Sequence, residues 1–169
     1  MTLSMFQASI PVFVRTLTNL KGILDKAVAH AQARKIDESV LLAARLYPDM
    51  FPLTRQVQIA TDFARGTGAR LAGVEPPSIE DTERTFAELA DRIDRTLAYL
   101  RTLTPAQVDG SEAREIIRAI RGVPHTFAGI DYLLKYALPN FYFHTTTAYA
   151  ILRHSGIEIG KTDFVGRFD

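Results

Sequence analysis

The chain has 169 residues, 47% of them hydrophobic and 23% charged, which is typical of a soluble globular protein, and we expect one domain over residues 1–169. Twenty Lys and Arg against nineteen Asp and Glu give a net charge of +1, which argues against a nucleic-acid-binding protein. Cys is absent, which excludes disulfides and thiolate metal sites. The first residues lack a secretory-signal pattern and no apolar stretch is long enough to span a membrane, so we expect a cytoplasmic protein with no membrane partner.

Helical periodicity dominates the first half of the chain. Apolar residues recur at spacings of three and four from Phe6 to Val28, as on one face of an amphipathic helix. Pro11 lies inside this pattern and predicts a kink or a fresh start near Ile10. A shorter helical element is expected over about 38–45.

A second long helix is expected to begin near Met50 or Pro52 and to end at Gly73, a residue type that favours helix C-termini. The carboxylate of Asp49, just before it, is expected to cap its N-terminus.

The third long helix is predicted from a capping-box pattern, in which Ser78 is the N-cap and Asp81 follows three residues later. Its core stripe runs from Phe86 to Leu100. Charged pairs four residues apart, among them Glu88 and Arg92, are interpreted as a solvated outer face.

The last third of the chain contains a short helical turn opened by Thr104-Pro105 and a region of alternating residues on both sides of Arg121-Gly122, which predicts a small β-hairpin. A last long helix is expected over 130–155 with a bend at Pro139, and the tail from Gly156 is expected to pack back on the bundle. The predicted fold class is therefore all-α, a four-helix bundle with a small hairpin before the last helix.

Polar residues interrupt the apolar stripe of the last helix at Asn140, His144, Thr147 and His154. Asn140 and His144 are one turn apart and could contact a common ligand. His154 is ten residues beyond His144, about 15 Å along the axis, so these two histidines cannot share a metal ion. A structural histidine and a site histidine both remain open for His144.

Residues 45–58 (RLYPDMFPLTRQVQ) and 138–156 (LPNFYFHTTTAYAILRHSG) resemble an uncharacterised bacterial family, a domain of unknown function grouped with the DinB/YfiT-like superfamily. The resemblance covers essentially the whole chain. It implies a DinB-like four-helix bundle that is commonly a homodimer through helix faces. Many DinB-like members hold a divalent metal with one histidine on the second helix and a His-x-x-x-His pair on the fourth, and some act as thiol-dependent transferases, isomerases or hydrolases.

This chain departs from the three-histidine pattern. The pair on the fourth helix falls on Asn140 and His144, and the second helix has no histidine, with Gln56 nearest to the missing position. One imidazole and two amide carbonyls are a weak set, because tight zinc or nickel binding needs three or more good ligands. Asp49 is the other candidate ligand. We therefore expect no tightly bound cofactor, with zinc or nickel at these residues as the alternative.

Three functions follow as hypotheses. The first is a metal-poor, non-catalytic bundle whose polar cleft at Gln56, Asn140 and His144 binds a small molecule or a partner. The second is a metal-dependent enzyme of DinB type, a thiol-dependent transferase or hydrolase, centred on His144 with a metal-bound water. Stoichiometric metal that is lost in His144→Ala would distinguish the second from the first. The third is a structural or regulatory dimer, in which Asn140→Ala and His144→Ala would change stability or assembly only.

Overall fold

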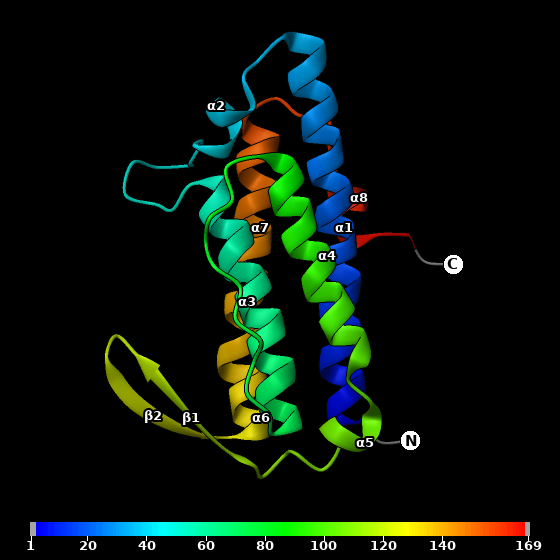
Figure 1. Cartoon of the computed structure of the whole chain (residues 1–169), viewed down its shortest axis with the longest axis vertical. Helices are drawn as coiled ribbons and strands as arrows, with labels where there is room; N and C mark the ends of the chain where they lie inside the picture. The colour runs from blue at the N-terminus through cyan, green and yellow to red at the C-terminus, as the bar shows by residue number, and fades with distance from the viewer. Residues whose placement is uncertain (1–2, 168–169) are drawn as a thin grey trace.

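A computed structural model of the chain describes residues 3–167. Four long helices lie side by side along the long axis of the molecule (Figure 1): α1 (Met5–Arg34), α3 (Leu53–Ala72), α4 (Phe86–Thr102) and α7 (Leu138–His154). The shorter elements are α2 (Glu38–Leu42), α5 (Pro105–Val108), β1 (Glu115–Ile120), β2 (Val123–Ala128), α6 (Gly129–Asp131), the π-helix η1 (Tyr132–Ala137) and α8 (Lys161–Val165). This is the predicted helical bundle with one antiparallel hairpin.

The apolar stripes of the four long helices meet in one core. Leu17 of α1, Val57 of α3 and Ile93 of α4 are fully buried there. The rings of Phe13 and Phe141 join α1 to α7, edge to face, with centroids 4.9 Å apart. Burial of these stripes is what holds the helices together, as in other bundles.

Helix α1 is continuous past Pro11, so the fresh start expected near Ile10 does not occur. A proline inside a helix removes one backbone hydrogen bond and crowds the preceding turn. Here Ile10 and Phe13 are buried in the core on both sides of Pro11, and this packing holds the helix together across it.

Helix α3 begins as predicted, but Asp49 does not cap it. Pro52 is the N-cap residue and makes no side-chain cap hydrogen bond, while Asp49 is exposed in the preceding loop. The loop is tied down instead by the backbone of Leu53, whose N–H donates to the carbonyl of Ala44 at 2.9 Å.

Helix α4 begins at Phe86, eight residues after the predicted N-cap Ser78. Thr85 and Glu88 form its capping box. The segment 74–85 crosses the bundle without regular helix, because its carboxylates bind arginines of α3 and α4, as described below. The predicted start at Ser78 is therefore wrong.

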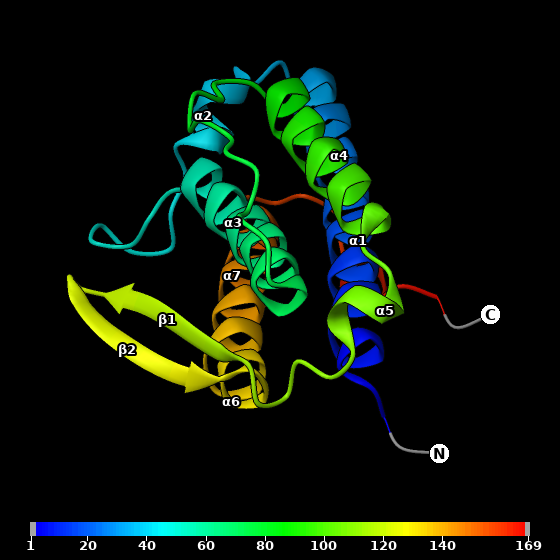
Figure 2. The ribbon, with the colours of Figure 1, turned by 60° about the horizontal axis from the view of Figure 1, so that its bottom comes forward.

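The hairpin projects from the bundle beside α3 and α7 in both ribbon views (Figures 1 and 2). Its register pairs Glu115 with Ala128 and Ile120 with Val123. Arg121 and Gly122 connect the strands with φ of 52° and 79°, the two positive values that the twist of a tight hairpin requires.

The last helix is interrupted before Pro139, where a bend is predicted. The structure forms a π-helical segment there, and the N–H of Leu138 donates to the carbonyl of Leu133 five residues earlier. Such segments change the direction in which side chains leave a helix and are frequent at functional sites. Tyr132 and Tyr136 are placed by this segment.

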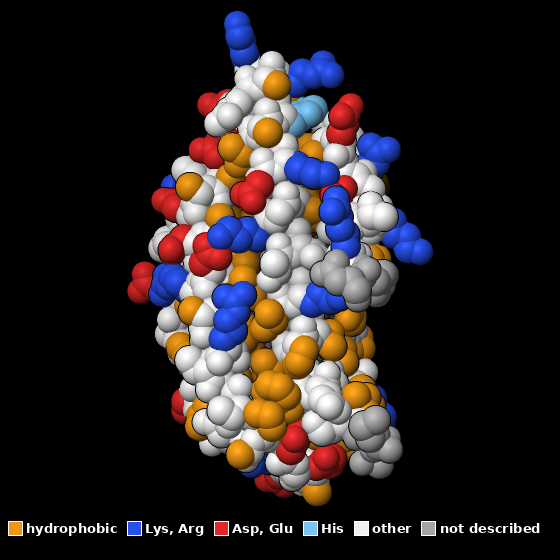
Figure 3. All heavy atoms as spheres, turned by 90° about the vertical axis from the view of Figure 1, so that its right-hand side faces the viewer, with side chains coloured by type: hydrophobic (Ala, Val, Ile, Leu, Met, Phe, Trp, Pro, Cys, Tyr) orange, Lys and Arg blue, Asp and Glu red, His pale blue; other side chains and the backbone are white. Residues whose placement is uncertain are grey.

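The tail packs back on α1 as expected. Arg15 donates to the backbone carbonyl of Val165 and Asn19 to that of Phe164, and Lys26 forms an ion pair with Asp163 at 2.7 Å. On the side where α1 and α8 lie, side chains of both charges intermingle in the upper part and hydrophobic ones gather below (Figure 3). Within residues 3–167, no helix is both long and apolar enough to cross a membrane.

Candidate functional site

Two of the predicted site residues, His144 and Gln56, lie together between α7 and α3. His144 Nδ1 is 2.7 Å from Gln56 Oε1, and Gln56 Nε2 donates to the carbonyl of Phe51 at 3.1 Å. The second bond fixes the orientation of the amide, so Gln56 Oε1 is the acceptor and His144 Nδ1 carries the proton. Both side chains are buried, and they are hydrogen-bonded to each other.

Burial holds His144 in its neutral form. It lowers the pKa of the imidazole from 6.5 to about 4, and the positive charge of Arg55 acts in the same direction. The ring of Phe63 stacks on His144 with centroids 6.0 Å apart, and Phe143 meets it edge to face. His144 is therefore uncharged near pH 7, with its proton on Nδ1.

The other two predicted site residues do not join this pair. Asn140 donates through Nδ2 to the carbonyl of Tyr136 on its own helix at 2.7 Å. Asp49 is exposed in the loop before α3 and makes no hydrogen bond or ion pair that the described part of the chain shows.

The residues at the three-histidine position do not fit a tightly held divalent ion. The carbonyl oxygen of Gln56 faces a proton on His144, and the Asn140 amide is held by Tyr136. His144 is the single imidazole of the set, and across residues 3–167 no group of three or more His, Asp or Glu is placed to hold a metal ion. Zinc and nickel sites are built from several such ligands.

A cleft of about 400 Å³ opens next to this pair, on the face of α3 that looks toward the hairpin. We call it the arginine cleft, because four arginines from two elements converge on it. It is lined by Arg55, Ile59, Asp62, Phe63, Arg65, Gly66, Arg70, Pro76, Arg118, Tyr132 and Tyr136. Phe63 connects the two sites, since its ring both lines the cleft and stacks on His144.

A buried ion-pair network lies on the α4 side of the cleft. The side chain of Arg92 is fully buried and binds three carboxylates, those of Asp62 at 2.7 Å, Asp81 at 2.9 Å and Glu83 at 2.9 Å. Its Nε donates to the hydroxyl of Thr61 at 2.7 Å. The prediction that Arg92 belongs to a solvated face is therefore wrong, since carboxylates from α3 and from segment 74–85 bury it.

These carboxylates also bind the arginines of α3. Asp62 accepts a hydrogen bond from Arg65 Nη2 at 2.7 Å, and Asp81 forms an ion pair with Arg55. Burial raises the pKa of Asp62, although the charges of Arg92 and Arg65 oppose that shift. Burial by itself would lower the pKa of Arg92, but its carboxylate partners outweigh it and raise that pKa.

Arg65 is short of hydrogen-bond acceptors. It is 8% exposed, and burial lowers the pKa of its guanidinium. Its Nε and Nη1 are buried and have no partner among the described residues. A buried donor left unmet costs about 1–3 kcal/mol, and more when the group is charged.

Aromatic rings also line the cleft. The ring centroids of Phe63 and Tyr136 are 5.6 Å apart, and those of Tyr136 and Tyr132 are 5.8 Å apart. Phe127 of β2 continues the row at 5.7 Å from Tyr136. The lining of the cleft therefore combines arginines with aromatic rings.

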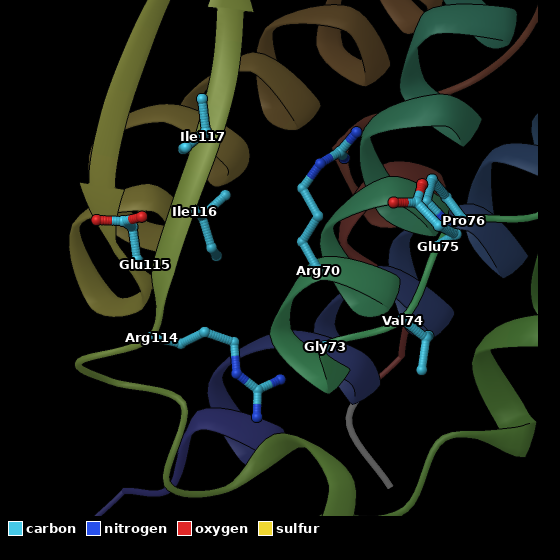
Figure 4. A pocket seen from close by; sticks show the side chains of 9 residues that line it. All are labelled: Arg70, Gly73, Val74, Glu75, Pro76, Arg114, Glu115, Ile116 and Ile117. Atoms are coloured by element: carbon cyan, nitrogen blue, oxygen red, sulfur yellow. The ribbon is translucent and has the colours of Figure 1, made fainter.

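A second hollow of about 300 Å³ adjoins the cleft at the end of α3 and shares Arg70 and Pro76 with it. Figure 4 shows Arg70 rising from α3 between β1 and the segment that carries Glu75 and Pro76. Arg114 lies lower, where its Nη1 donates to the carbonyl of Leu71 near the end of α3.

The comparisons agree with this architecture. The family model described as "Domain of unknown function (DUF1993)" matches residues 5–165. The chain belongs to the DUF1993 family. A crystal structure of a DinB family member protein from Shewanella denitrificans is 41% identical, with a TM-score of 0.91, and the match covers 96% of this chain and 92% of that one. The resemblance to a DinB-like family is thereby confirmed, and no curated protein matches.

In this DUF1993 chain, sequence reasoning singled out Gln56 and His144 and missed the arginine cleft. A signal was present: Arg55, Asp62, Gly66 and Arg70 recur at helical spacing on one face of α3, opposite the core stripe. Charged residues in this pattern are usually solvated, so the pattern alone does not indicate a cleft. Arg118 and the tyrosines arrive there only through the hairpin and the π-helix.

Proposed function

We propose that this DUF1993 bundle binds a small molecule in the arginine cleft without the help of a metal ion. The observation that carries the proposal is the cleft itself, a hollow of about 400 Å³ whose lining combines convergent polar groups with aromatic rings. Small-molecule sites are commonly concave, about 300–1,000 Å³ in volume, with a few placed polar groups among apolar walls.

The donor set supports the metal-independent part of the proposal. His144 Nδ1 and Gln56 Oε1 bind each other, and the Asn140 amide binds its own helix. We assign a positioning role to the hydrogen-bonded pair of His144 and Gln56, because His144 stacks on the ring of Phe63, which lines the cleft.

The test is a thermal-shift screen of a fragment library in the presence of EDTA, with one variant that fills the cleft. Gly66 lines the cleft, and the atoms nearest to a Cβ there belong to the flexible guanidinium of Arg70, so Gly66→Leu should occupy the hollow by displacing that guanidinium. Gly22→Leu is the matched control, since a Cβ at Gly22 of α1 has no atom within 4 Å.

A ligand at ten times its Kd stabilises the fold by about 1.4 kcal/mol, which raises Tm by about 3–6 °C for a chain of this size. We expect hits that stabilise the wild type and Gly22→Leu but not Gly66→Leu. Absence of any hit, hits that need added metal, or hits that survive in Gly66→Leu would contradict the proposal.

We further propose that the chain forms a homodimer through an apolar patch between α7 and the loop that precedes α3. Five large apolar side chains are exposed there: Leu46, Tyr47, Phe51, Tyr142 and Phe143. Leu46, Tyr142 and Phe143 line an apolar hollow together with Met50, and Tyr47 and Phe51 belong to the same loop as Leu46 and Met50. Contiguous exposed apolar surface of this kind favours a protein interface, and a second copy of the same face would cover it.

The test is the molar mass in solution by light scattering. We expect a dimer for the wild type and a monomer for Phe143→Asp. Leu134→Asp, at an equally exposed leucine of η1 outside the patch, should remain a dimer. A monomeric wild type would contradict the proposal.

A further inference from the structure

The arginine cleft carries more positive charge than its carboxylates balance. Three carboxylates form ion pairs with three arginines here: Asp62, Asp81 and Glu83 with Arg92, Arg65 and Arg55. Arg70 and Arg118 line the same cleft, and in the described part of the chain no carboxylate oxygen lies within 4 Å of either. Two arginines are thus in excess.

The two arginines in excess are available to a ligand. Arg70 makes one long hydrogen bond, 3.4 Å from Nη1 to the hydroxyl of Tyr132, and Arg118 reaches the cleft from the exposed strand β1. Glu75 and Glu115 line the neighbouring hollow, but neither forms an ion pair with Arg70 (Figure 4). A guanidinium in such a position binds carboxylate and phosphate oxygens well.

A third arginine of the cleft, Arg65, has fewer hydrogen-bond acceptors than donors. Arg65 is more than nine-tenths buried and lines the cleft, and its Nε and Nη1 have no hydrogen-bond partner among residues 3–167. A charged donor that is buried without acceptors is unfavourable unless a ligand or water completes it. The charge of Arg65 is thus only partly compensated and adds to the positive potential of the cleft that it lines.

The aromatic part of the lining selects for shape. The rings of Phe63, Tyr136 and Tyr132 follow one another at 5.6 and 5.8 Å and give the cleft an aromatic surface beside its arginines. A flat ring can pack against such a surface, as aromatic side chains pack against one another.

We infer that the ligand of the arginine cleft is a small organic anion, a flat ring that carries a carboxylate or a phosphate group. The inference rests on the proposed small-molecule function and names its ligand class. The anionic group faces Arg70 and Arg118, and the ring lies against Phe63 and Tyr136.

The experiment compares probes that share one ring and differ in charge: benzoate, phenyl phosphate, the neutral benzyl alcohol and the cationic benzamidine. Inorganic phosphate serves as the probe without a ring. Binding is measured by NMR titration of the wild type and of a double variant, Arg70→Met with Arg118→Met. These two side chains lie outside the Arg92 network, so the variant should fold. Arg101→Met, at an exposed arginine of α4, is the matched control.

We expect benzoate or phenyl phosphate to bind the wild type at least tenfold more tightly than benzyl alcohol or benzamidine. The double variant should lose at least tenfold in that affinity, and Arg101→Met should lose none. Binding should also weaken several-fold when salt is raised from 20 to 500 mM, because the attraction is electrostatic. The tighter of the two anions decides between carboxylate and phosphate.

Equal affinity for the neutral or cationic probe, or unchanged anion binding in the double variant, would overturn the inference. Inorganic phosphate binding as tightly as phenyl phosphate would overturn the role of the ring. The two proposals fail separately. If neutral or cationic fragments bind the wild type but not Gly66→Leu, and no anion binds, the small-molecule function is supported and the anionic ligand class is wrong. If no probe or fragment binds at all, both proposals are wrong.

Discussion

His144 Nδ1 and Gln56 Oε1 lie 2.7 Å apart, although 88 positions separate them in the chain. This bond joins α7 to α3 and occupies both His144 Nδ1 and Gln56 Oε1, so Nε2 is the ring nitrogen of His144 that keeps a lone pair. His144 is thus a neutral, hydrogen-bonded interior residue, and Phe63, which stacks on it, lines the cleft in which we propose the ligand site.

The stability of the fold should depend on pH through His144. Its pKa in the folded state is about 4, below the 6.5 of an exposed histidine. The unfolded chain therefore binds the proton first, so the contribution of His144 is fully present above about pH 6.5 and is lost as the pH falls toward 4. We expect a loss of about 3 kcal/mol in the free energy of unfolding between pH 7 and pH 4.

Urea unfolding of the wild type and of His144→Gln at several pH values measures this contribution. The glutamine can still donate to Gln56, and all carboxylates titrate alike in both proteins, so the difference between the two curves isolates His144. A difference that does not change between pH 7 and pH 4 would contradict the buried, neutral imidazole.

Arg92 should be one of the most sensitive positions for stability. Its removal leaves Asp62, Asp81 and Glu83 without their common partner, and breaking a buried ion pair in this way costs about 3–5 kcal/mol. We expect Arg92→Met to lower the free energy of unfolding by that amount in urea denaturation near pH 7.

Arg95→Met is the control for Arg92, because Arg95 lies one turn later on α4 and is exposed. It should change the free energy of unfolding by less than about 0.5 kcal/mol. Equal effects at the two positions would mean that Arg92 belongs to the solvated face after all.

Asn140→Ala should have a small effect. The side chain makes one hydrogen bond to the carbonyl of Tyr136, which stabilises the fold by about 0.5–1.5 kcal/mol. The higher helix propensity of alanine offsets part of the stability that is lost with this bond. We expect a change below about 1 kcal/mol and no change in how Tm responds to added zinc. A zinc response that is present in the wild type and lost in Asn140→Ala would show that Asn140 is a ligand.

The helices and the hairpin could be predicted because their signals are local. Spacings of three and four identify the helices, and Arg121-Gly122 supplies the turn residues that a tight hairpin needs. The predicted start of α4 at Ser78 is wrong because Ser78 and Asp81 match the capping-box pattern without forming one. In the structure Asp81 forms ion pairs with Arg92 and Arg55 instead. That contact is tertiary and leaves no local pattern.

The candidate site was predictable in part. His144 follows from the polar residues that interrupt the apolar stripe of the last helix, Gln56 follows from the family resemblance, and the structure brings the two together. The arginine cleft was not predictable, since Arg70 and Arg118 come from elements far apart in sequence and meet only after the hairpin docks beside α3. An arginine on a helix face looks the same in a sequence whether water or a cleft lies in front of it.

The most direct test of the proposed function is an amide NMR map of the uniformly ¹⁵N-labelled protein, recorded in EDTA with a fragment that stabilises it. If the ligand occupies the arginine cleft, shifted amides should cluster in 55–70, 114–118 and 129–136, and Gly66→Leu should abolish the shifts. Shifts confined to 46–50 and 142–150, or shifts that appear only when a divalent metal is added, would contradict a metal-independent ligand site in this cleft.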